Sequence, residues 1–305
     1  MEELIQLNSF SIQTTLKILL EDKTTKKNII WATNSYQSYG EKYSERSQIT
    51  IDLLNGLNSI DIQPRVLKSR DAQHTRTKKR AEVFTPSWIC NQMNNYCDDE
   101  WFGKKNVFNI QNEDHVWKSK RGRIGFPKSL GKTWKDYILS TRLEITCGEA
   151  PYLVSRYDTT TGELIKLNTR IGMLDRKFRV INENTSTQEE WFEWVIKAYQ
   201  STYGYEFQGD NLLIARINLL LTFVDNYIHK WNEEPAKRDL KKIANIISWN
   251  VWQMDGLTYQ VPLGGELTEA PSEINEEINL YSKIKDWTSR NGKAIYFKDL
   301  RKENK

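Results

Sequence analysis

The chain of 305 residues has few cysteines and few histidines. Its cysteines, Cys90, Cys97 and Cys147, are odd in number and form no Cys-x-x-Cys pair. The histidines are scattered along the sequence. A disulfide framework and a structural zinc site both need paired or clustered ligands. We therefore expect neither a disulfide framework nor a bound metal.

Long apolar runs are missing as well. No segment approaches the roughly 20 apolar residues that a membrane-spanning helix needs, and the start, Met1-Glu2-Glu3-Leu4, lacks the basic-then-apolar order of a signal peptide. These two absences predict a cytoplasmic protein with no membrane partner.

Aromatic residues, in contrast, are plentiful, with 11 Trp and 14 Tyr. Such a composition is unlike that of a disordered chain, and this length can bury a substantial core. The apolar residues Leu16, Leu19 and Leu20, at helical spacing, predict a mostly helical segment over residues 1–80, with a basic end. A second unit is expected over residues 81–305, with an insertion at about residues 98–132.

Positive charge gathers in two runs, although the net charge is only +4. Residues 65–80 hold seven cations against one acid, Asp71, and residues 118–132 hold six cations and no acid. Such patches suit phosphate backbones, where counterion release favours binding. A solvated face is the ordinary alternative for any single run. The residues expected to contact nucleic acid are Arg65, Lys68, Arg70, Arg76, Lys78, Lys79, Arg80, Lys120, Arg121 and Arg123.

The middle of the chain alternates between strand and helix patterns. Thr85-Pro86 reads as the start of a helix, with Ile89, Met93, Tyr96 and Cys97 on one apolar face. Residues 133–141 predict a short helix and residues 142–146 a strand. Thr187 and Glu190 form a capping box before the next helix. Further strands are expected over residues 202–207, within 243–252 and over 293–297, with a long amphipathic helix from about residue 213. Such alternation is typical of an α/β fold with a parallel sheet and a ligand at its carboxyl edge.

Acids follow the predicted strands in order. Glu144 precedes a small-residue turn at Gly148, while Glu206 and Asp255 come at the ends of the second and third strands. Backbone amides of such a turn can approach a ligand closely, and a carboxylate after the second strand can accept from both ribose hydroxyls, as in dinucleotide sites. Each acid taken alone is commonly a cap or a solvated residue. The ordered set favours a cofactor with an amino-acid end, a ribose and an adenine.

These residues resemble a known family. Phe84-Thr85-Pro86, residues 143–153, Tyr203-Gly204-Tyr205-Glu206 and Met254-Asp255-Gly256 resemble, in order, the cofactor motifs of adenine-N6 DNA methyltransferases. The nearest kind is the type II restriction–modification methylases, also described as restriction endonuclease subunit M. The resemblance implies a Rossmann-like methyltransferase fold, S-adenosyl-L-methionine as cofactor and a role in phage defence.

The resemblance also implies a role for each matching residue. Phe84, Thr85 and Pro86 would line the methionine end of the cofactor, and Glu144, Thr146, Gly148 and Ala150 would form the cofactor loop. Glu206 and Phe207 would hold the ribose, and Asp255 and Gly256 the adenine, with Asp286 as a reserve candidate. Ala150 replaces a family glycine, Pro151 follows it, and Ile145 stands where the family has proline.

The family's catalytic segment, Asn or Asp followed by Pro-Pro and Tyr or Phe, is absent, because no two of the seven prolines are adjacent. In the family this segment holds the flipped adenine. The resemblance therefore predicts no catalytic residue in this chain. It implies either half of a split enzyme, completed by a second polypeptide that carries this segment and target recognition, or a truncated remnant. A half sheet would expose an unpaired edge, which favours a partner.

Other functions stay open on the sequence alone. The chain could be a catalytically inactive, methyltransferase-like module that binds nucleic acid. A nuclease would need an Asp and a Glu-x-Lys on a strand, and Glu21-Asp22-Lys23 and Glu41-Lys42 offer only fragments of that pattern. The cofactor half does not encode the substrate, so RNA or protein stays open as the methyl acceptor.

Overall fold

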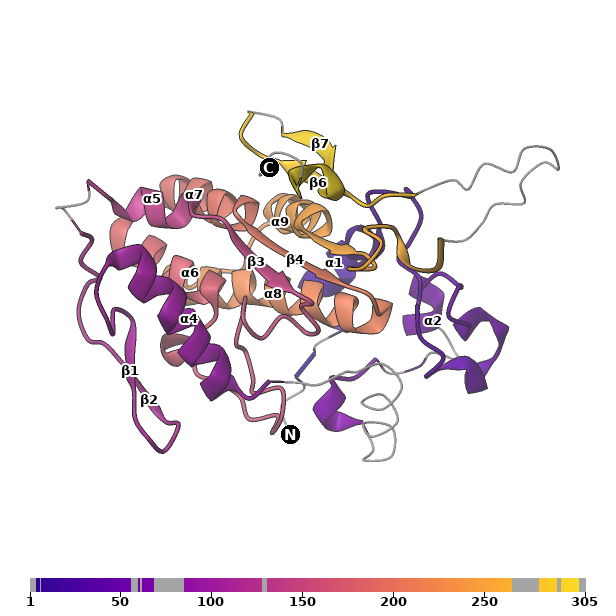
Figure 1. Ribbon diagram of the computed structural model, residues 1–305, viewed down its shortest axis with the longest axis horizontal. Helices are drawn as coiled ribbons and strands as arrows, with labels where there is room; N and C mark the ends of the chain where they lie inside the picture. The colour runs from indigo at the N-terminus through magenta and orange to yellow at the C-terminus, as the bar shows by residue number, and fades with distance from the viewer. Residues whose placement is uncertain are drawn as a thin grey trace.

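The structure is a computed structural model that describes residues 4–5, 7–55, 60, 62–68, 85–127, 131–264, 280–289 and 292–301. Helices and a parallel sheet combine in a mixed α/β architecture (Figure 1), as the alternating pattern predicts. The helices are α1 (Phe10–Leu20), α2 (Ile51–Asn55), α4 (Ser87–Phe102), α5 (Trp134–Leu139), α6 (Met173–Asn184), α7 (Gln188–Gln200), α8 (Gly209–Trp231) and α9 (Lys237–Asn250). The strands are β1 (Asn109–Gln111), β2 (Trp117–Ser119), β3 (Arg142–Ile145), β4 (Thr202–Glu206), β5 (Val251–Gln253), β6 (Lys283–Asp286) and β7 (Lys293–Tyr296).

The central sheet has the order β3-β4-β5, and both pairings are parallel. Glu144 lies opposite Gly204, and Glu206 lies opposite Gln253. The third strand is shorter than the sequence suggests, because residues 243–250 belong to α9 and only residues 251–253 are extended. Apolar residues at Ile243 and Ile247 fit a buried helix face as well as a strand, so periodicity alone does not separate the two.

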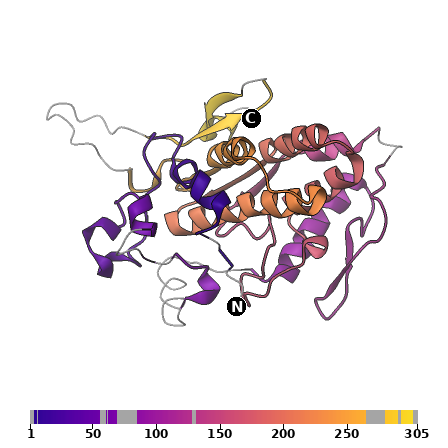
Figure 2. The ribbon, with the colours of Figure 1, turned by 180° about the vertical axis from the view of Figure 1, so that it is seen from behind.

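The core lies between the sheet and the helices that connect its strands. Helix α8 is buried over most of its length, and its apolar residues pack with α7, α9 and the N-terminal helix α1. Figure 2 shows these helices from behind the sheet. Helix α7 begins as predicted, with the Thr187 side chain accepting a hydrogen bond from the Glu190 amide. Helix α1 therefore contributes to the same core as the sheet. The boundary expected near residue 80 lies outside the described residues.

The opposite face of the sheet is covered unevenly. The hairpin β6–β7, which lies near the top of the molecule in Figure 1, packs over Tyr205 and Trp252. The part of this face that belongs to β3 is open, since Leu143 is 38% exposed and Ile145 is 64% exposed. Strands of parallel sheets are ordinarily buried on both faces. Among the described residues, β3 pairs with β4 alone, so its outer edge and one of its faces are both exposed.

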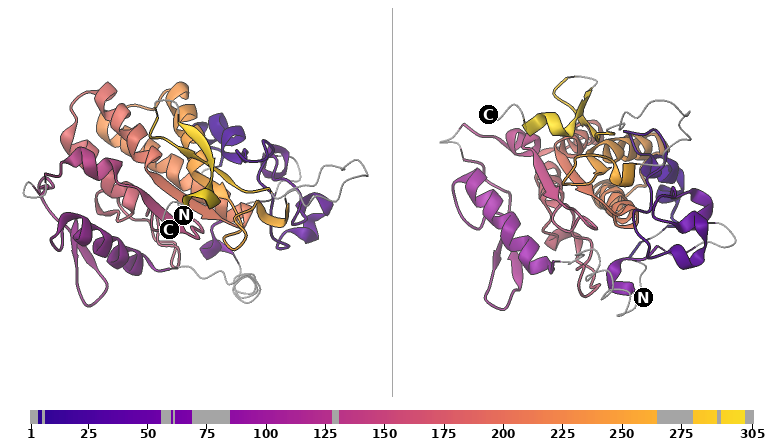
Figure 3. Two further views of the ribbon diagram at one scale, coloured as in Figure 1. Left: turned by 45° about the horizontal axis from the view of Figure 1, so that its top comes forward. Right: turned by 45° about the vertical axis from the view of Figure 1, so that its right-hand side comes forward.

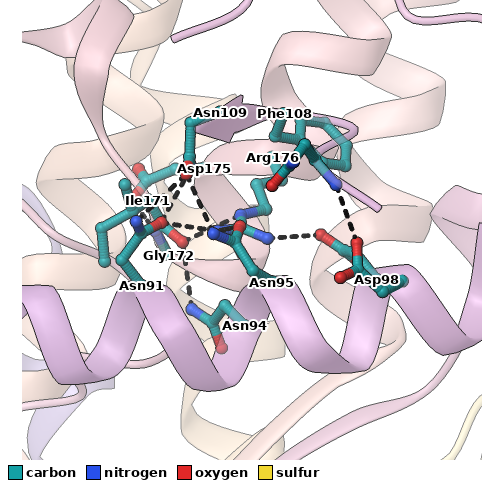
Figure 4. Close-up of polar contacts among 12 residues, drawn as sticks. Asn91, Asn94, Asn95, Asp98, Phe108, Asn109, Ile171, Gly172, Asp175 and Arg176 are labelled. Carbon is teal, nitrogen blue, oxygen red and sulfur yellow. Dashed lines mark hydrogen bonds and ion pairs between the residues drawn. The ribbon is translucent and has the colours of Figure 1, made fainter. Parts of the chain in front are cut away.

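Helix α4 is turned the opposite way from the prediction. Met93 and Tyr96, expected to face the core, are 50% and 64% exposed, while Asn91, Asn94 and Asp98 are buried. Figure 4 shows the reason, which is a polar cluster around Arg176 of α6. The helix also begins one residue later than expected, with Pro86 rather than Thr85 as its N-cap.

The described part of the expected insertion contains regular structure. After the end of α4 it forms the antiparallel hairpin β1–β2, which extends beside α4 and α6 (Figure 3). The prediction that residues 1–80 are mostly helical is wrong for the described residues, because only α1 and α2 are α-helices and most of residues 21–50 is turn and extended chain.

Candidate cofactor site at the carboxyl edge of the sheet

The loop after β3 makes a tight turn at the carboxyl edge of the sheet. Gly148 and Ala150 have positive φ values of 51° and 65°. The Ala150 amide donates to the Cys147 carbonyl at 2.6 Å, and the Val154 amide donates to the Ala150 carbonyl at 2.9 Å. Alanine takes a left-handed backbone at a steric cost that glycine avoids. Ala150 is fully buried, so the surrounding packing holds this strained conformation.

Glu144 fixes the far side of this loop. Its carboxylate accepts hydrogen bonds from the amides of Tyr152 at 3.3 Å and Leu153 at 3.0 Å. The side chain is 6% exposed, and burial raises the pKa of Glu144 well above its usual range, against the lowering effect of the two amides. Glu144 therefore stabilises the conformation of the loop through these two backbone amides.

Glu206 joins the first turn to the second strand. Its carboxylate accepts from the Gly148 amide at 2.9 Å and from the Gln208 amide at 3.1 Å. The strands approach closely here, because a Cβ at Gly204 would lie 3.2 Å from the Cβ of Cys147. These distances bring Glu206, expected at the ribose, next to Gly148, expected in the cofactor loop.

Asp255 follows β5 at the same edge. Its carboxylate accepts from the Leu257 amide at 2.8 Å and the Thr258 amide at 3.4 Å, so it stabilises its own turn. Gly256 lies against Tyr205, where a Cβ would come within 2.8 Å of the phenol oxygen. Phe207 is half-buried, and its carbonyl accepts from the Gln253 amide group at 2.8 Å.

The start of α4 lies against the same loop. The carbonyl of Tyr152 accepts from Asn94 at 3.0 Å, and the Thr85 side chain hydrogen bonds to the Tyr152 phenol, whose pKa is raised chiefly by burial. Asp158 accepts from the Ser87 amide at 2.7 Å and so caps the helix. Thr85 and Pro86 are therefore near the cofactor loop.

The remaining predicted positions are spread more widely. Thr146 is exposed beside the loop, and Phe84 lies outside the described residues. Asp286 ends β6, and the neighbouring Trp287 indole donates to Asn250, which directly precedes β5. Asp286 is thus near the amino-terminal ends of the central strands, whereas Asp255 follows their carboxyl ends.

Several residues at this edge were not singled out from the sequence. The Glu149 carboxylate accepts from the Tyr157 hydroxyl at 2.6 Å and from the Arg65 amide at 2.7 Å. Asn218 donates to the Glu149 carbonyl and to the Tyr157 hydroxyl, both at 3.1 Å. Burial, together with Glu149, raises the pKa of Tyr157 well above its usual range. The side-chain amide oxygen of Asn218 is buried and has no hydrogen-bond partner among the described residues.

Asp210, in the first turn of α8, is the other acid at this edge that the sequence reading missed. It is completely buried and accepts from the Tyr36 hydroxyl at 2.9 Å and from the Lys68 ammonium at 3.0 Å. A buried charge is normally paired, as here. The signal available in the sequence was an acid, Asp210, placed with Asn211 directly before an apolar run. Lys68 is held in this ion pair, with its side chain 12% exposed.

The basic residues divide between two places. The main chain at Arg65 and the side chain at Lys68 contact the cofactor edge. Lys120, Arg121 and Arg123 are exposed after the hairpin β1–β2, where the Arg123 guanidinium donates to Asn184 at 2.9 Å. The other predicted nucleic-acid contacts lie outside the described residues; they are Arg70, Arg76, Lys78, Lys79 and Arg80.

A buried polar cluster positions α4 beside this site (Figure 4). The Arg176 guanidinium donates to Asp98 at 2.6 Å and to Asn91 and Asn95 at 2.9 Å each. Asp98 also accepts from the Arg142 guanidinium of β3 at 3.1 Å. These contacts join the middle and second half of α4 to α6 and β3.

Within the described ranges, no group of His, Cys, Asp and Glu side chains could hold a metal ion. None of the helices that the structure describes is long and apolar enough to cross a membrane. Comparison with known proteins found no matching family model, no matching curated protein and no matching solved structure.

Proposed function

We propose that this chain is the S-adenosyl-L-methionine-binding part of a site-specific DNA adenine-N6 methyltransferase in a restriction–modification system. The observation that carries the proposal is the 2.9 Å hydrogen bond from the Gly148 amide to the Glu206 carboxylate. It places an acid and a sharp turn together at the carboxyl edge of two parallel strands, where ligands of open α/β sheets bind. The family's Rossmann-like fold forms part of the same proposal.

The residues present fit such a cofactor. Glu206 accepts from the amides of Gly148 and Gln208 and places a carboxylate at this edge, the group that binds ribose hydroxyls in dinucleotide sites. The buried side-chain amide oxygen of Asn218, without a partner among the described residues, is a further acceptor at this edge. The loop at Gly148 and Ala150 would take the methionine end, with Thr85 and Pro86 beside it, and Asp255 and Gly256 would take the adenine. The bound cofactor would supply the methyl group.

The exposed side of the sheet supports a second polypeptide. The open edge belongs to β3, where Leu143 and Ile145 are exposed, whereas all three residues of β5 are buried. The sheet edge formed by β5 is therefore covered, whereas the sheet edge formed by β3, beside the cofactor loop, is open. A partner strand added next to β3 would bring its own residues close to Gly148. This is where a chain that carries the missing catalytic segment would need to be.

Isothermal titration calorimetry tests the cofactor assignment. The wild-type chain is titrated with S-adenosyl-L-methionine and compared with Glu206→Ala, with Glu206→Gln, which keeps the size of the side chain, and with Glu193→Ala, an exposed acid on α7. Losing a charged hydrogen-bond acceptor should weaken binding by on the order of 1–3 kcal/mol, or about 5- to 150-fold in Kd. The Glu193 variant should bind like wild type.

No heat at millimolar cofactor, from protein whose circular dichroism shows that it is folded, would reject the proposal. Equal affinity of the wild-type and Glu206→Ala chains would reject the role of Glu206.

A catalytically inactive module that binds nucleic acid is the second candidate. The exposed cations Lys120 and Arg121 favour it, because they lie apart from the cofactor edge. DNA binding that persists in a chain unable to bind the cofactor would select this alternative. Methyl transfer from labelled cofactor to DNA by the chain with its partner would exclude it.

A further inference from the structure

A cavity of about 650 Å³ lies between the hairpin β1–β2, the turn Leu167–Thr169 and helix α6. Its size falls within the range of ligand pockets, which is about 300–1,000 Å³. The residues of the cofactor edge discussed above, Gly148, Glu206 and Asp255, do not line it. The cavity is therefore a separate candidate site.

The walls of this cavity are fastened to one another. The Trp117 indole donates to the Thr169 carbonyl at 2.8 Å, and the Ser119 hydroxyl donates to the Asn168 carbonyl at 3.1 Å. From α6, the Arg179 guanidinium donates to the carbonyls of Lys120 at 2.8 Å and Gly122 at 3.0 Å. These bonds tie the hairpin to the body of the molecule and give the cavity a defined shape.

The charge of the lining is strongly positive. Six Lys or Arg side chains and two Asp or Glu side chains contribute to it. The arginines deeper inside have acidic partners, such as Asp98 for Arg176 and Asp225 for Arg170. The three cations nearest the hairpin, Lys118, Lys120 and Arg121, are exposed and form no ion pair with any residue that the structure describes.

A smaller hollow of about 190 Å³ shares Lys120, Arg121 and Gly122 with the first cavity. Lys104 and Arg123 also line it, and no acid does. Two neighbouring hollows with unpaired cations between them fit an extended polyanion better than a single small anion.

Two of the lining residues each carry a buried hydrogen-bonding atom without a partner among the described residues. One guanidinium nitrogen of Arg170 and one carboxylate oxygen of Asp175 are buried and make no hydrogen bond within the described chain. The other Asp175 oxygen accepts from the amide and hydroxyl of Ser155 and from the Gly172 amide. Buried polar atoms without partners in a folded protein call for a missing partner. The groups that the cavity offers to a ligand include exposed cations at the rim and an aromatic ring in the wall. A nucleotide within a strand offers phosphates and a base that match them, whereas a free phosphate has no base to stack.

We propose that this cavity binds one unstacked nucleotide of a nucleic-acid strand, whose phosphates lie along Lys118, Lys120 and Arg121. The base enters between the hairpin and α6, and the Trp117 ring in the wall provides a surface for stacking. This inference rests on the proposed function only for the choice of nucleic acid as the polyanion.

Fluorescence anisotropy with a short labelled single-stranded DNA and with its duplex tests the proposal on the full chain. Arg121→Glu removes charge at the rim, and Lys241→Glu is its control, an exposed lysine on α9. We expect Arg121→Glu to weaken binding about tenfold and to lower the slope of log Kd against log salt by about 1 or more. The control should stay within about twofold of wild type, since it contacts no phosphate.

A second substitution separates the cavity from its charged rim. Asn168→Trp places a large ring at an exposed position of the lining without changing charge, and Ser289→Trp adds the same ring on the hairpin β6–β7. Asn168→Trp should weaken binding as strongly as Arg121→Glu while the salt slope stays constant. A base analogue that fluoresces when unstacked should brighten on binding to wild type and not to Asn168→Trp.

Each contrary outcome is decisive. Unchanged affinity in Asn168→Trp would reject the cavity as the nucleotide site, and unchanged affinity in Arg121→Glu would reject the phosphate path. Adenosine monophosphate and inorganic phosphate are titrated separately. If either binds as tightly as the strand does, the cavity is a site for a free ligand, and the proposal of a nucleic-acid strand is rejected. Cofactor calorimetry on the same variants should match wild type, so failure of the cofactor proposal would be seen independently.

Discussion

The polar cluster under α4 gives the sharpest stability prediction, the substitution Asp98→Asn. Asp98 is 4% exposed and holds three donors, which are the Arg176 guanidinium at 2.6 Å, the Arg142 guanidinium at 3.1 Å and the Tyr137 hydroxyl at 3.0 Å. Arg176 is 2% exposed. Asparagine keeps the shape of the side chain and loses its charge, so Arg176 would stay buried without a counter-charge.

The expected cost follows from that arrangement. Breaking a buried ion pair by removing one partner typically costs about 3–5 kcal/mol, because the remaining charge is uncompensated. Asn91 and Asn95 still accept from Arg176 and soften the loss, so we expect about 3 kcal/mol. A domain of marginal stability, with about 5–15 kcal/mol in total, would lose a large share of it.

Urea unfolding followed by circular dichroism measures this loss. Glu100→Gln, an exposed acid on the same helix, is the matched control and should change the unfolding free energy by less than about 0.5 kcal/mol. A cycle with Arg142→Met should give a coupling energy of about 0.5–3 kcal/mol. A loss below about 1 kcal/mol in Asp98→Asn would mean that the ion pair does not hold α4 in place, and would refute the reasoning.

Two further perturbations test the packing at the cofactor edge. Gly209→Ala should lower the unfolding free energy by about 2 kcal/mol or more, because the added methyl would overlap the Ile30 carbonyl oxygen. The control Gly125→Ala, with open space around it, should leave the unfolding free energy nearly unchanged. Equal effects of the two substitutions in a urea titration would contradict this prediction. Burial raises the pKa of Glu144 above its unfolded value, so the carboxyl contributes stability below that unfolded pKa and loses it as pH rises. The unfolding free energy of wild type minus that of Glu144→Gln should therefore fall from about pH 4.5 upward, by at most about 1.4 kcal/mol per pH unit. If this difference in unfolding free energy rises with pH instead, the two backbone amides keep Glu144 ionised and the prediction is wrong.

The sheet and its acids could be read from the sequence because the signals are local. A strand end, an acid and a glycine turn lie within a few residues of one another, as at Glu144 and Gly148. The boundary between α9 and β5 was not accessible in this way, since Ile243 and Ile247 suit either structure.

Helix α4 shows why the rest could not be predicted. Its exposed side carries Met93 and Tyr96, and its buried side carries Asn91, Asn94 and Asp98. Hydrophobic periodicity assigns the apolar side to the core. The polar side wins because Arg176, far along the chain, supplies charge and hydrogen bonds to that side. A partner at that sequence distance is invisible to local pattern reading.

The binding of S-adenosyl-L-methionine at the carboxyl edge of the sheet is the central claim, and hydrogen–deuterium exchange with and without the cofactor tests it most directly. Amides that contact the ligand or become ordered by it exchange more slowly. We predict slower exchange at Gly148 and the following loop residues, and at Gln208 beside Glu206, with no change in the hairpin β1–β2. Cofactor-dependent protection confined to the hairpin, or none at residues 147–153 and 206–209, would contradict the account.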